Sequence, residues 1–297
     1  MVPALFLLFA SLVNNVRGLI DQHDFAGAEH VVRAYRAQAG ATSELAVALS
    51  WLARGALDAK RYDQADSYAA ETRKLALELL GTRQLDAGRW LPTALGASIE
   101  VHAQALAARG ERGEAIAFLR QQLGLFGATS LNERIRKNIN LLTLEGKPAP
   151  LLEENDWLGS KPASLAALRG HPVLLFFWAH WCPDCKAQAP VLAALKNTYG
   201  PQGLVLVGPT RLYGFAAGGE EAAPAAEKQY IEQVRRRYYA ALADMPVPLG
   251  AANFLAYGAS TTPTLILIDR AGVVRFYHPG AASEPELSAR IQAILRE

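Results

Sequence analysis

Cys182 and Cys185 are the only cysteines in this chain of 297 residues, and they lie in the stretch WAHWCPDC at 178–185. A thiolate attacks a disulfide to form a mixed disulfide, which a second thiol close by then resolves. Two intervening residues in a helical turn let both sulfurs bond and separate with little backbone movement. The pair therefore predicts a redox-active disulfide, with Cys182 as nucleophile and Cys185 as resolving thiol.

The residues on either side of the pair favour a reactive Cys182. The apolar run Pro172–Trp178 precedes it and is typical of a strand buried on both faces. Cys185 falls in the first turn of an expected helix, where Pro183 is tolerated because its missing N–H would have no partner in the helix. The N–H groups and dipole of that helix N-terminus favour a thiolate at Cys182.

Three side chains near the cysteines add to this prediction. We expect Trp178 and Trp181 to shield the centre and to offer a flat apolar rim to a substrate. Asp184 places a negative charge near the sulfurs, which is expected to raise the pKa of Cys182. Because a less stable thiolate makes a more reducing couple, we predict a reductase and not a strong oxidant.

Two other uses of a Cys-x-x-C pair are less favoured. Zinc needs four ligands, there is no third cysteine, and no two histidines have zinc-finger spacing among His23, His30, His102, His171, His180 and His278. A purely structural disulfide would stabilise little, because the loop that it closes is so short. We therefore expect no metal, and no cofactor other than the Cys182–Cys185 disulfide.

The second half of the chain alternates between strand and helix patterns. Strands are expected at 172–178, 203–208, 264–268 and 273–277, and helices after the cysteines, at 227–242 and at 285–295. Asp269–Gly272 has the composition of a hairpin turn. This order predicts a three-layer α/β sheet of mixed direction.

On these residues the second half resembles the thioredoxin superfamily. The pattern W-x-x-W-C-x-x-C-K follows an apolar strand, and GKPAP at 146–150 with SLAALRG at 164–170 resembles the TlpA/ResA-like thiol–disulfide oxidoreductases. The resemblance implies a thioredoxin-like fold, a kink at Pro190, a cis-proline at Pro263, and a Thr262 backbone that pairs with substrate. We place Trp181, Pro183 and Asp184 with Thr262 in the predicted substrate-binding set.

Two positions lack a carboxylate that these families often carry. Phe176 stands where the thioredoxin family often has a buried acid, and Gln188 where ResA-like members often have Glu. Neither can take the proton from Cys185. We expect water, Lys186 or Asp184 to do so less efficiently.

The first half is helical by its periodicity. Three segments each carry a small alanine early in a helix (Ala28, Ala65 and Ala115), after helices expected at 12–22, 43–59 and 91–108. They resemble tetratricopeptide-type hairpins, although their spacing is irregular. Such an all-α unit is either a surface that docks partners or a scaffold that covers its neighbour, and the sequence does not favour one of these.

We divide the chain into an apolar N-terminal segment at 1–20, a helical-repeat domain at 21–145 and a thioredoxin-like domain at 146–297. The apolar stretch at 1–13 is shorter than the ~20 residues that span a bilayer, and is expected to be a signal remnant or a first helix. The net charge of +2 gives no indication of nucleic-acid binding. The resemblance implies a periplasmic or otherwise extracytoplasmic location, with a cytoplasmic one as the alternative.

The sequence thus predicts a thiol–disulfide oxidoreductase, a reductase of protein disulfides, supplied by an electron donor that we expect to be membrane-bound. The alternative is a helical-repeat binding module with a vestigial or regulatory redox centre. A peroxide-reducing enzyme is less favoured because it would use a lone cysteine. The glycine-rich stretch 208–219 is expected to be a solvent loop, or else to bring Arg211 and Tyr213 to the substrate.

Overall fold

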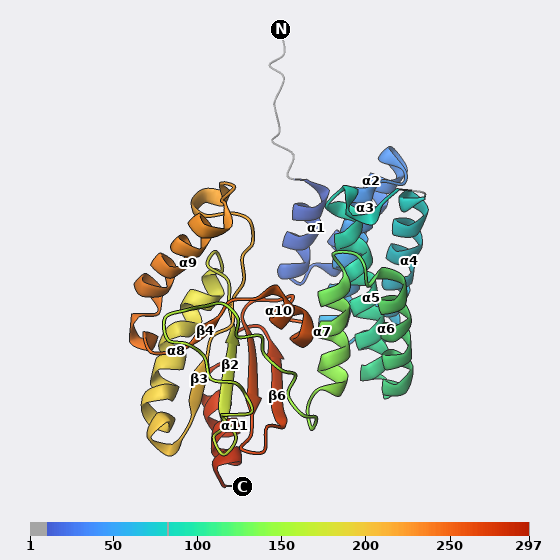
Figure 1. Ribbon diagram of the computed structural model, residues 1–297. Helices are drawn as coiled ribbons and strands as arrows, with labels where there is room; N and C mark the ends of the chain where they lie inside the picture. Colours follow the sequence, from blue (N-terminus) through green and yellow to red (C-terminus); the bar gives the residue numbers. More distant parts are fainter. Residues whose placement is uncertain (1–10, 82, 297) are drawn as a thin grey trace. The chain divides into compact units, whose positions relative to one another are not determined.

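The computed structural model describes residues 11–81 and 83–296, which form two compact units divided between Asn138 and Ile139 (Figure 1). Half of the segment predicted at 1–20, residues 1–10, lies outside the described residues, and the other half is Ser11 and the first helix, which begins at Leu12. The predicted three-part division of the chain stays a prediction. No helix among the described residues is long and apolar enough to cross a membrane.

Helices build the first unit. Their bounds are α1 (Leu12–Asp21), α2 (Phe25–Ala39), α3 (Ser43–Asp58), α4 (Tyr62–Leu80), η1 (Leu85–Ala87), α5 (Trp90–Ala108), α6 (Arg112–Phe126) and α7 (Asn132–Thr143), which continues past the division. Side-chain caps fix several N-termini: Asp24 accepts from the Gly27 N–H at 2.9 Å, and Thr42 accepts from the Leu45 N–H at 3.1 Å.

Consecutive helices of this unit pack as pairs. α1 contacts α2, α3 contacts α4, and α5 contacts α6, while α3 also packs against α1 and α5. The three alanines that the sequence singles out, Ala28, Ala65 and Ala115, are all fully buried. Small side chains at these positions let the paired helices approach closely, so the repeated alanines have a packing role.

A partly buried carboxylate joins α5 to α7. Glu100 accepts from Arg134 Nε at 2.6 Å and from Lys137 Nζ at 2.8 Å. Burial alone would raise the pKa of Glu100, but the charges of the two cations and their hydrogen bonds outweigh it and lower that pKa to about 2. Burial also lowers the pKa of Lys137, with Glu100 opposing the shift.

Glu100→Gln is expected to lower the free energy of unfolding at pH 7 by about 3 kcal/mol, because it leaves Arg134 and Lys137 without their counter-charge. The folded-state pKa lies below the ordinary 4.5, so the ionised carboxylate stabilises the fold above about pH 4.5 and loses that effect as the pH falls toward 2. Urea unfolding of the full chain, followed by far-ultraviolet circular dichroism at pH 7 and pH 3, measures both effects. Glu78→Gln, in the exposed pair with Lys74 at 4.0 Å, is the control and is expected to cost less than about 1 kcal/mol. Equal losses in the two variants would contradict this account.

A four-stranded mixed sheet forms the centre of the second unit. Its order is β3-β2-β5-β6, with β2 (Val173–Phe177), β3 (Val205–Val207), β5 (Thr264–Ile268) and β6 (Val274–Pro279). β2 runs parallel to β3 and antiparallel to β5, and β5 runs antiparallel to β6. This is the mixed direction that the strand and helix order predicts.

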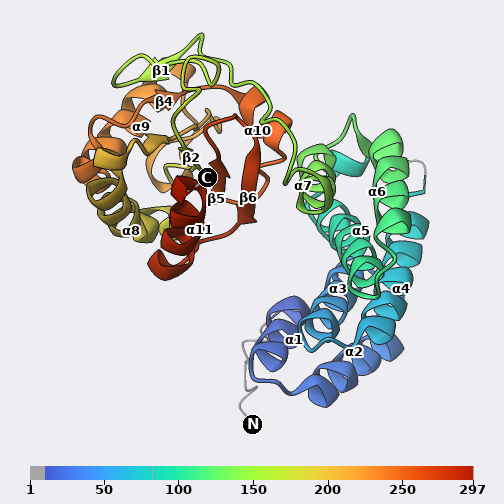
Figure 2. The same cartoon turned by 90° about the horizontal axis from the view of Figure 1, so that it is seen from below.

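Helices cover both faces of this sheet (Figure 2). Leu174 and Phe176 of β2 pack into the cluster that includes residues of α8 (Pro183–Tyr199), α9 (Pro224–Tyr238) and α11 (Glu284–Arg296). The alternate residues Val173, Leu175 and Phe177 pack into a second cluster with α10 (Ala251–Tyr257). Burial on both faces explains why the strand reads as a continuous apolar run.

Several short elements of this unit were not predicted. They are α10, the two-stranded pair β1 (Trp157–Leu158) and β4 (Val247–Pro248), and the 3-10 turns η2 (Gly200–Gln202), η3 (Ala217–Gly219) and η4 (Ala240–Leu242). The helix expected at 227–242 begins earlier, at Pro224, and ends at Tyr238, where η4 follows after one residue. Elements this short give too few residues for a periodic pattern.

Candidate redox active site

The ends of β2 and β3 bring two loops to the same edge of the sheet, because the two strands are parallel. The Trp178 N–H donates to the Pro209 carbonyl at 3.1 Å, and its Nε1–H donates to the Gly208 carbonyl at 2.9 Å. In return, Thr210 Oγ1 donates to the Trp178 carbonyl at 2.8 Å. These bonds join the loop before Cys182 to the loop after β3.

The two cysteines stand at the N-terminus of α8, as their spacing predicts. They form a disulfide with Cα atoms 5.3 Å apart. Cys182 is the N-cap residue of α8, and its Sγ accepts the N–H of Cys185 at 3.0 Å. In the reduced protein this donor and the helix dipole would stabilise a thiolate on Cys182. Cys182 is only 2% exposed and Cys185 is fully buried.

The loop between α10 and β5 meets the cysteines from the other side. Phe177, the last residue of β2, pairs with Thr264, so the start of β5 lies beside the end of β2. The Thr262–Pro263 peptide bond is cis, and the Thr262 carbonyl oxygen lies 3.4 Å from Cys182 Sγ. The structure therefore brings Cys182, Thr262 and Pro263 together, and their roles in catalysis stay predictions.

The remaining residues of the predicted substrate-binding set are at the surface. Trp181 is 48% exposed, Pro183 and Asp184 are exposed, and Thr262 is half-buried. Trp178, in contrast, is fully buried, and its ring lies 4.8 Å from that of Tyr239. The expectation that Trp178 shares the apolar rim is wrong, because its ring packs in the hydrophobic core of the unit.

Gln188, which stands where ResA-like proteins often have Glu, forms two hydrogen bonds with the backbone of Ala282. Its Nε2 donates to the Ala282 carbonyl at 2.9 Å, and its Oε1 accepts the Ala282 N–H at 3.0 Å. A carboxylate could accept from this backbone but could not donate to it. Phe176 lies in the core, and Lys186 lies over the Tyr238 ring at 4.8 Å. The proton acceptor for Cys185 stays a prediction.

Sequence reasoning missed two buried polar residues beside the site. His180 is 1% exposed, and its ring lies 5.3–5.6 Å from the rings of Tyr213, Phe215 and Tyr230. Burial lowers its pKa, against the opposing effects of Glu227 and the Phe215 backbone. Glu227, also 1% exposed, accepts the backbone N–H of Tyr213 at 2.5 Å. No spacing could have revealed this set, because it depends on how a glycine-rich loop folds back.

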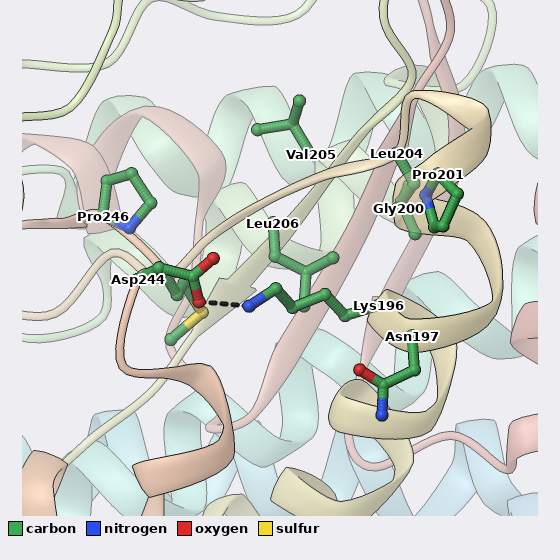
Figure 3. Close-up of a pocket in the computed structure, with 10 residues that line it drawn as sticks. Lys196, Asn197, Gly200, Pro201, Leu204, Val205, Leu206, Asp244 and Pro246 are labelled. Carbon is green, nitrogen blue, oxygen red and sulfur yellow. Dashed lines mark hydrogen bonds and ion pairs between the residues drawn. The ribbon is translucent and has the colours of Figure 1, made fainter.

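A separate hollow of about 570 Å³ lies beside β3 and the end of α8 (Figure 3). It includes Val205, which pairs with Val173 at the start of β2, so this hollow is at the opposite end of the sheet from Cys182. Lys196 and Asp244 point toward one another across it and form an ion pair. Neither cysteine lines it, so the redox site is not this hollow. Within the described part of the chain, no three His, Cys, Asp or Glu side chains are grouped so as to hold a metal ion.

The family model described as Redoxin matches residues 144–293. The chain belongs to the Redoxin family. Over 156 residues, this Redoxin chain is 31% identical to the thiol:disulfide interchange protein DsbE of Pseudomonas fluorescens biotype C, covering 51% of this chain and 78% of that protein. It is 27% identical over 150 residues to the thioredoxin-like protein YneN of Bacillus subtilis, covering 50% and 78%.

Among solved structures, this Redoxin chain is similar to a thiol:disulfide interchange protein of the thioredoxin family from Chlorobium tepidum TLS. The likeness covers 50% of this chain and 96% of that one, with 23% identity and a TM-score of 0.37. Family membership and the named relatives confirm the thioredoxin-like fold of the second half and identify a thiol–disulfide oxidoreductase. The first unit is helical, as predicted, and its tetratricopeptide-like character stays a prediction.

Gly208→Ala is expected to lower the free energy of unfolding by about 1–3 kcal/mol, because overpacking a buried site forces its neighbours to move. A Cβ at this position would lie 2.5 Å from Cε of Met245, which is 2% exposed. Gly124→Ala, where a Cβ would meet nothing within 4 Å in the interior of α6, is the matched control. It is expected to be neutral or to stabilise by up to about 1 kcal/mol. Urea unfolding compares them, and equal stabilities would contradict the close approach at Gly208.

Proposed function

We propose that this protein reduces protein disulfides through Cys182 and Cys185. The observation that carries the proposal is the N–H of Cys185 donating to Cys182 Sγ at the N-terminus of α8. A sulfur held by a backbone donor at this end of a helix is the one that ionises more readily. Cys182 is then the nucleophile, and Cys185 is the thiol that resolves the intermediate.

The reaction begins with both cysteines reduced. The Cys182 thiolate attacks one sulfur of the substrate disulfide, whose S–S bond breaks, and the leaving sulfur takes a proton. Cys185 then loses its proton and attacks Cys182 Sγ, which releases the second substrate sulfur as a thiol. The substrate gains two electrons and two protons, and the protein ends as the disulfide that the structure shows. A dithiol electron donor must then reduce the Cys182–Cys185 disulfide to begin another cycle.

Cys185→Ser is expected to accumulate a mixed disulfide with an oxidised protein substrate, because the resolving thiol is missing. Reduced Cys185→Ser is mixed with insulin, and non-reducing electrophoresis with mass spectrometry measures the adduct on Cys182. Cys182→Ser is the matched control and is expected to form little adduct. If Cys182→Ser trapped insulin as well as Cys185→Ser does, the assignment of the two roles would be wrong.

The direction of electron flow is part of the proposal. Asp184 is exposed in the first turn of α8, so its charge opposes the helix dipole next to Cys182. This raises the pKa of Cys182 above the value that the helix alone would give it, and a less stable thiolate favours a reducing couple.

Asp184→Asn is expected to lower the pKa of Cys182 by a few tenths of a unit to about one unit. The midpoint potential is expected to rise by about 10–30 mV, because the reduced form is then more stable. Thiolate absorbance at 240 nm gives the pKa, and equilibration with glutathione gives the potential. Glu284→Gln, an acid in the first turn of α11, is the matched control and is expected to change neither. An unchanged or higher pKa in Asp184→Asn would contradict the proposed direction.

The helical unit and the location complete the proposal. We propose that the helix pairs of the first unit dock protein partners, and that the chain works outside the cytoplasm with an electron donor at the membrane. The paired helices and the resemblance to TlpA/ResA-like proteins support these two points. A binding module with a vestigial redox centre is the alternative, and the intact disulfide beside Thr262 favours the enzyme. Turnover of insulin with dithiothreitol separates these alternatives, and cell fractionation tests the location.

A further inference from the structure

The loop that follows β3, residues 209–222, is folded tightly upon itself. Phe215 and Glu221 form an isolated antiparallel bridge, and the Ala222 N–H donates to the Gly214 carbonyl at 3.0 Å. Gly214 has a φ of 86°, which a residue with a side chain rarely adopts. The stretch 208–219 is expected from the sequence to be a solvent loop, but its residues 208–210 are buried, while 211–219 are half-buried or exposed.

Tyr213 of this loop lies against the redox site. Its ring centroid is 5.6 Å from that of Trp181, in an edge-to-face arrangement at 82°. It also packs on the hydrophobic cluster that contains Cys182 and Cys185. On another side, the Arg211 guanidinium lies 5.1 Å from the Tyr213 ring centroid. The rings of Trp181 and Tyr213 thus make one aromatic wall, which begins at the residue next to Cys182.

A buried carboxylate fixes the peptide that carries this ring. Glu227 uses Oε1 to accept the Tyr213 N–H at 2.5 Å and Oε2 to accept the Gly214 N–H at 2.8 Å. The buried imidazole of His180 supports the ring from inside, at 5.6 Å between centroids. A carboxylate buried this deeply is costly unless its oxygens are satisfied, so its two bonds hold the backbone of the loop in one place.

We propose that Tyr213 is a specificity-determining residue that binds the polypeptide beside the substrate disulfide, with Glu227 and His180 as positioning residues. The occupant is an extended segment with an apolar or aromatic side chain next to its cysteine, because the wall offers ring faces and edges for such a side chain to pack on. A small disulfide has no such side chain, so its reduction is expected to depend little on Tyr213. This inference rests on the proposed reduction of protein disulfides.

Tyr213→Ala is expected to raise the KM for insulin about three- to tenfold, the effect of losing one aromatic contact, and to change kcat less than about twofold. The rate with bis(2-hydroxyethyl) disulfide is expected to stay within about twofold of wild type. Tyr213→Phe keeps the ring and is expected to retain the wild-type KM. Leu151→Ala, which removes an 80% exposed apolar side chain beside the hairpin at the other end of β5, is the surface control.

If Tyr213→Ala does not fold, two other variants test the proposal. Glu227→Gln replaces the carboxylate with an amide of nearly the same size, and Tyr213→Leu removes the ring but keeps an apolar side chain. Each is expected to raise the KM for insulin about two- to fivefold without changing the rate with the small disulfide. Equal losses with both substrates, or no loss with either, would overturn the proposal. If wild type reduced neither substrate, the proposed function itself would fail. An active wild type whose Tyr213 variants show no selective loss would overturn only the inference about Tyr213.

Discussion

The backbone hydrogen bond from the Cys185 N–H to Cys182 Sγ is the interaction on which the chemistry of this protein depends. It makes the first cysteine the cap of α8 and leaves the second one turn inside, where it is fully buried. Both cysteines are buried, so it is the backbone donor at Cys182, which stabilises the ionised form of that sulfur, that distinguishes them. This asymmetry is what allows a nucleophile and a resolving thiol to share a single turn of helix.

The sheet supplies the rest of the arrangement. Parallel pairing of β2 with β3 and antiparallel pairing of β2 with β5 bring the end of β2, the end of β3 and the start of β5 to one edge. Trp178 then joins two of the loops at this edge through three hydrogen bonds that involve its indole and its backbone. Helices bury both faces of the sheet, so the strands that end at this edge are packed in the hydrophobic core. A densely packed core keeps the ends of these strands in place.

The sequence predicted the parts of this arrangement that local patterns control. The spacing of Cys182 and Cys185 predicted a disulfide, and the structure has one. The apolar run predicted a buried strand, which is β2. The composition of Asp269–Gly272 predicted a hairpin turn, and the Gly272 N–H donates to the Asp269 carbonyl in that turn. The main helices of the first unit begin and end within one residue of the predicted positions, at α1, α3 and α5, because their periodic patterns are long.

Contacts made through folded loops could not be predicted in this way. Trp178 and Trp181 look equivalent in the sequence, yet Trp178 is fully buried and Trp181 is 48% exposed. The Trp178 ring packs in the core and its Nε1–H donates to the Gly208 carbonyl, whereas Trp181 lies edge-to-face with Tyr213. Nothing in the sequence distinguishes Glu227 from the other acidic residues. Its role depends on the fold of the glycine-rich loop, which brings the N–H groups of Tyr213 and Gly214 to its carboxylate. Neither outcome follows from spacing, since each depends on a tertiary contact between distant residues.

The most direct test of this account is a titration of the reduced full chain, in which thiolate absorbance is followed together with the rate of alkylation at each cysteine. We predict that Cys182 ionises below the ordinary cysteine pKa of about 8.5 and is alkylated first, while Cys185 stays protonated to higher pH. If Cys182 ionised at or above about 8.5, or if Cys185 reacted first, the central claim of a helix-stabilised nucleophile would be wrong.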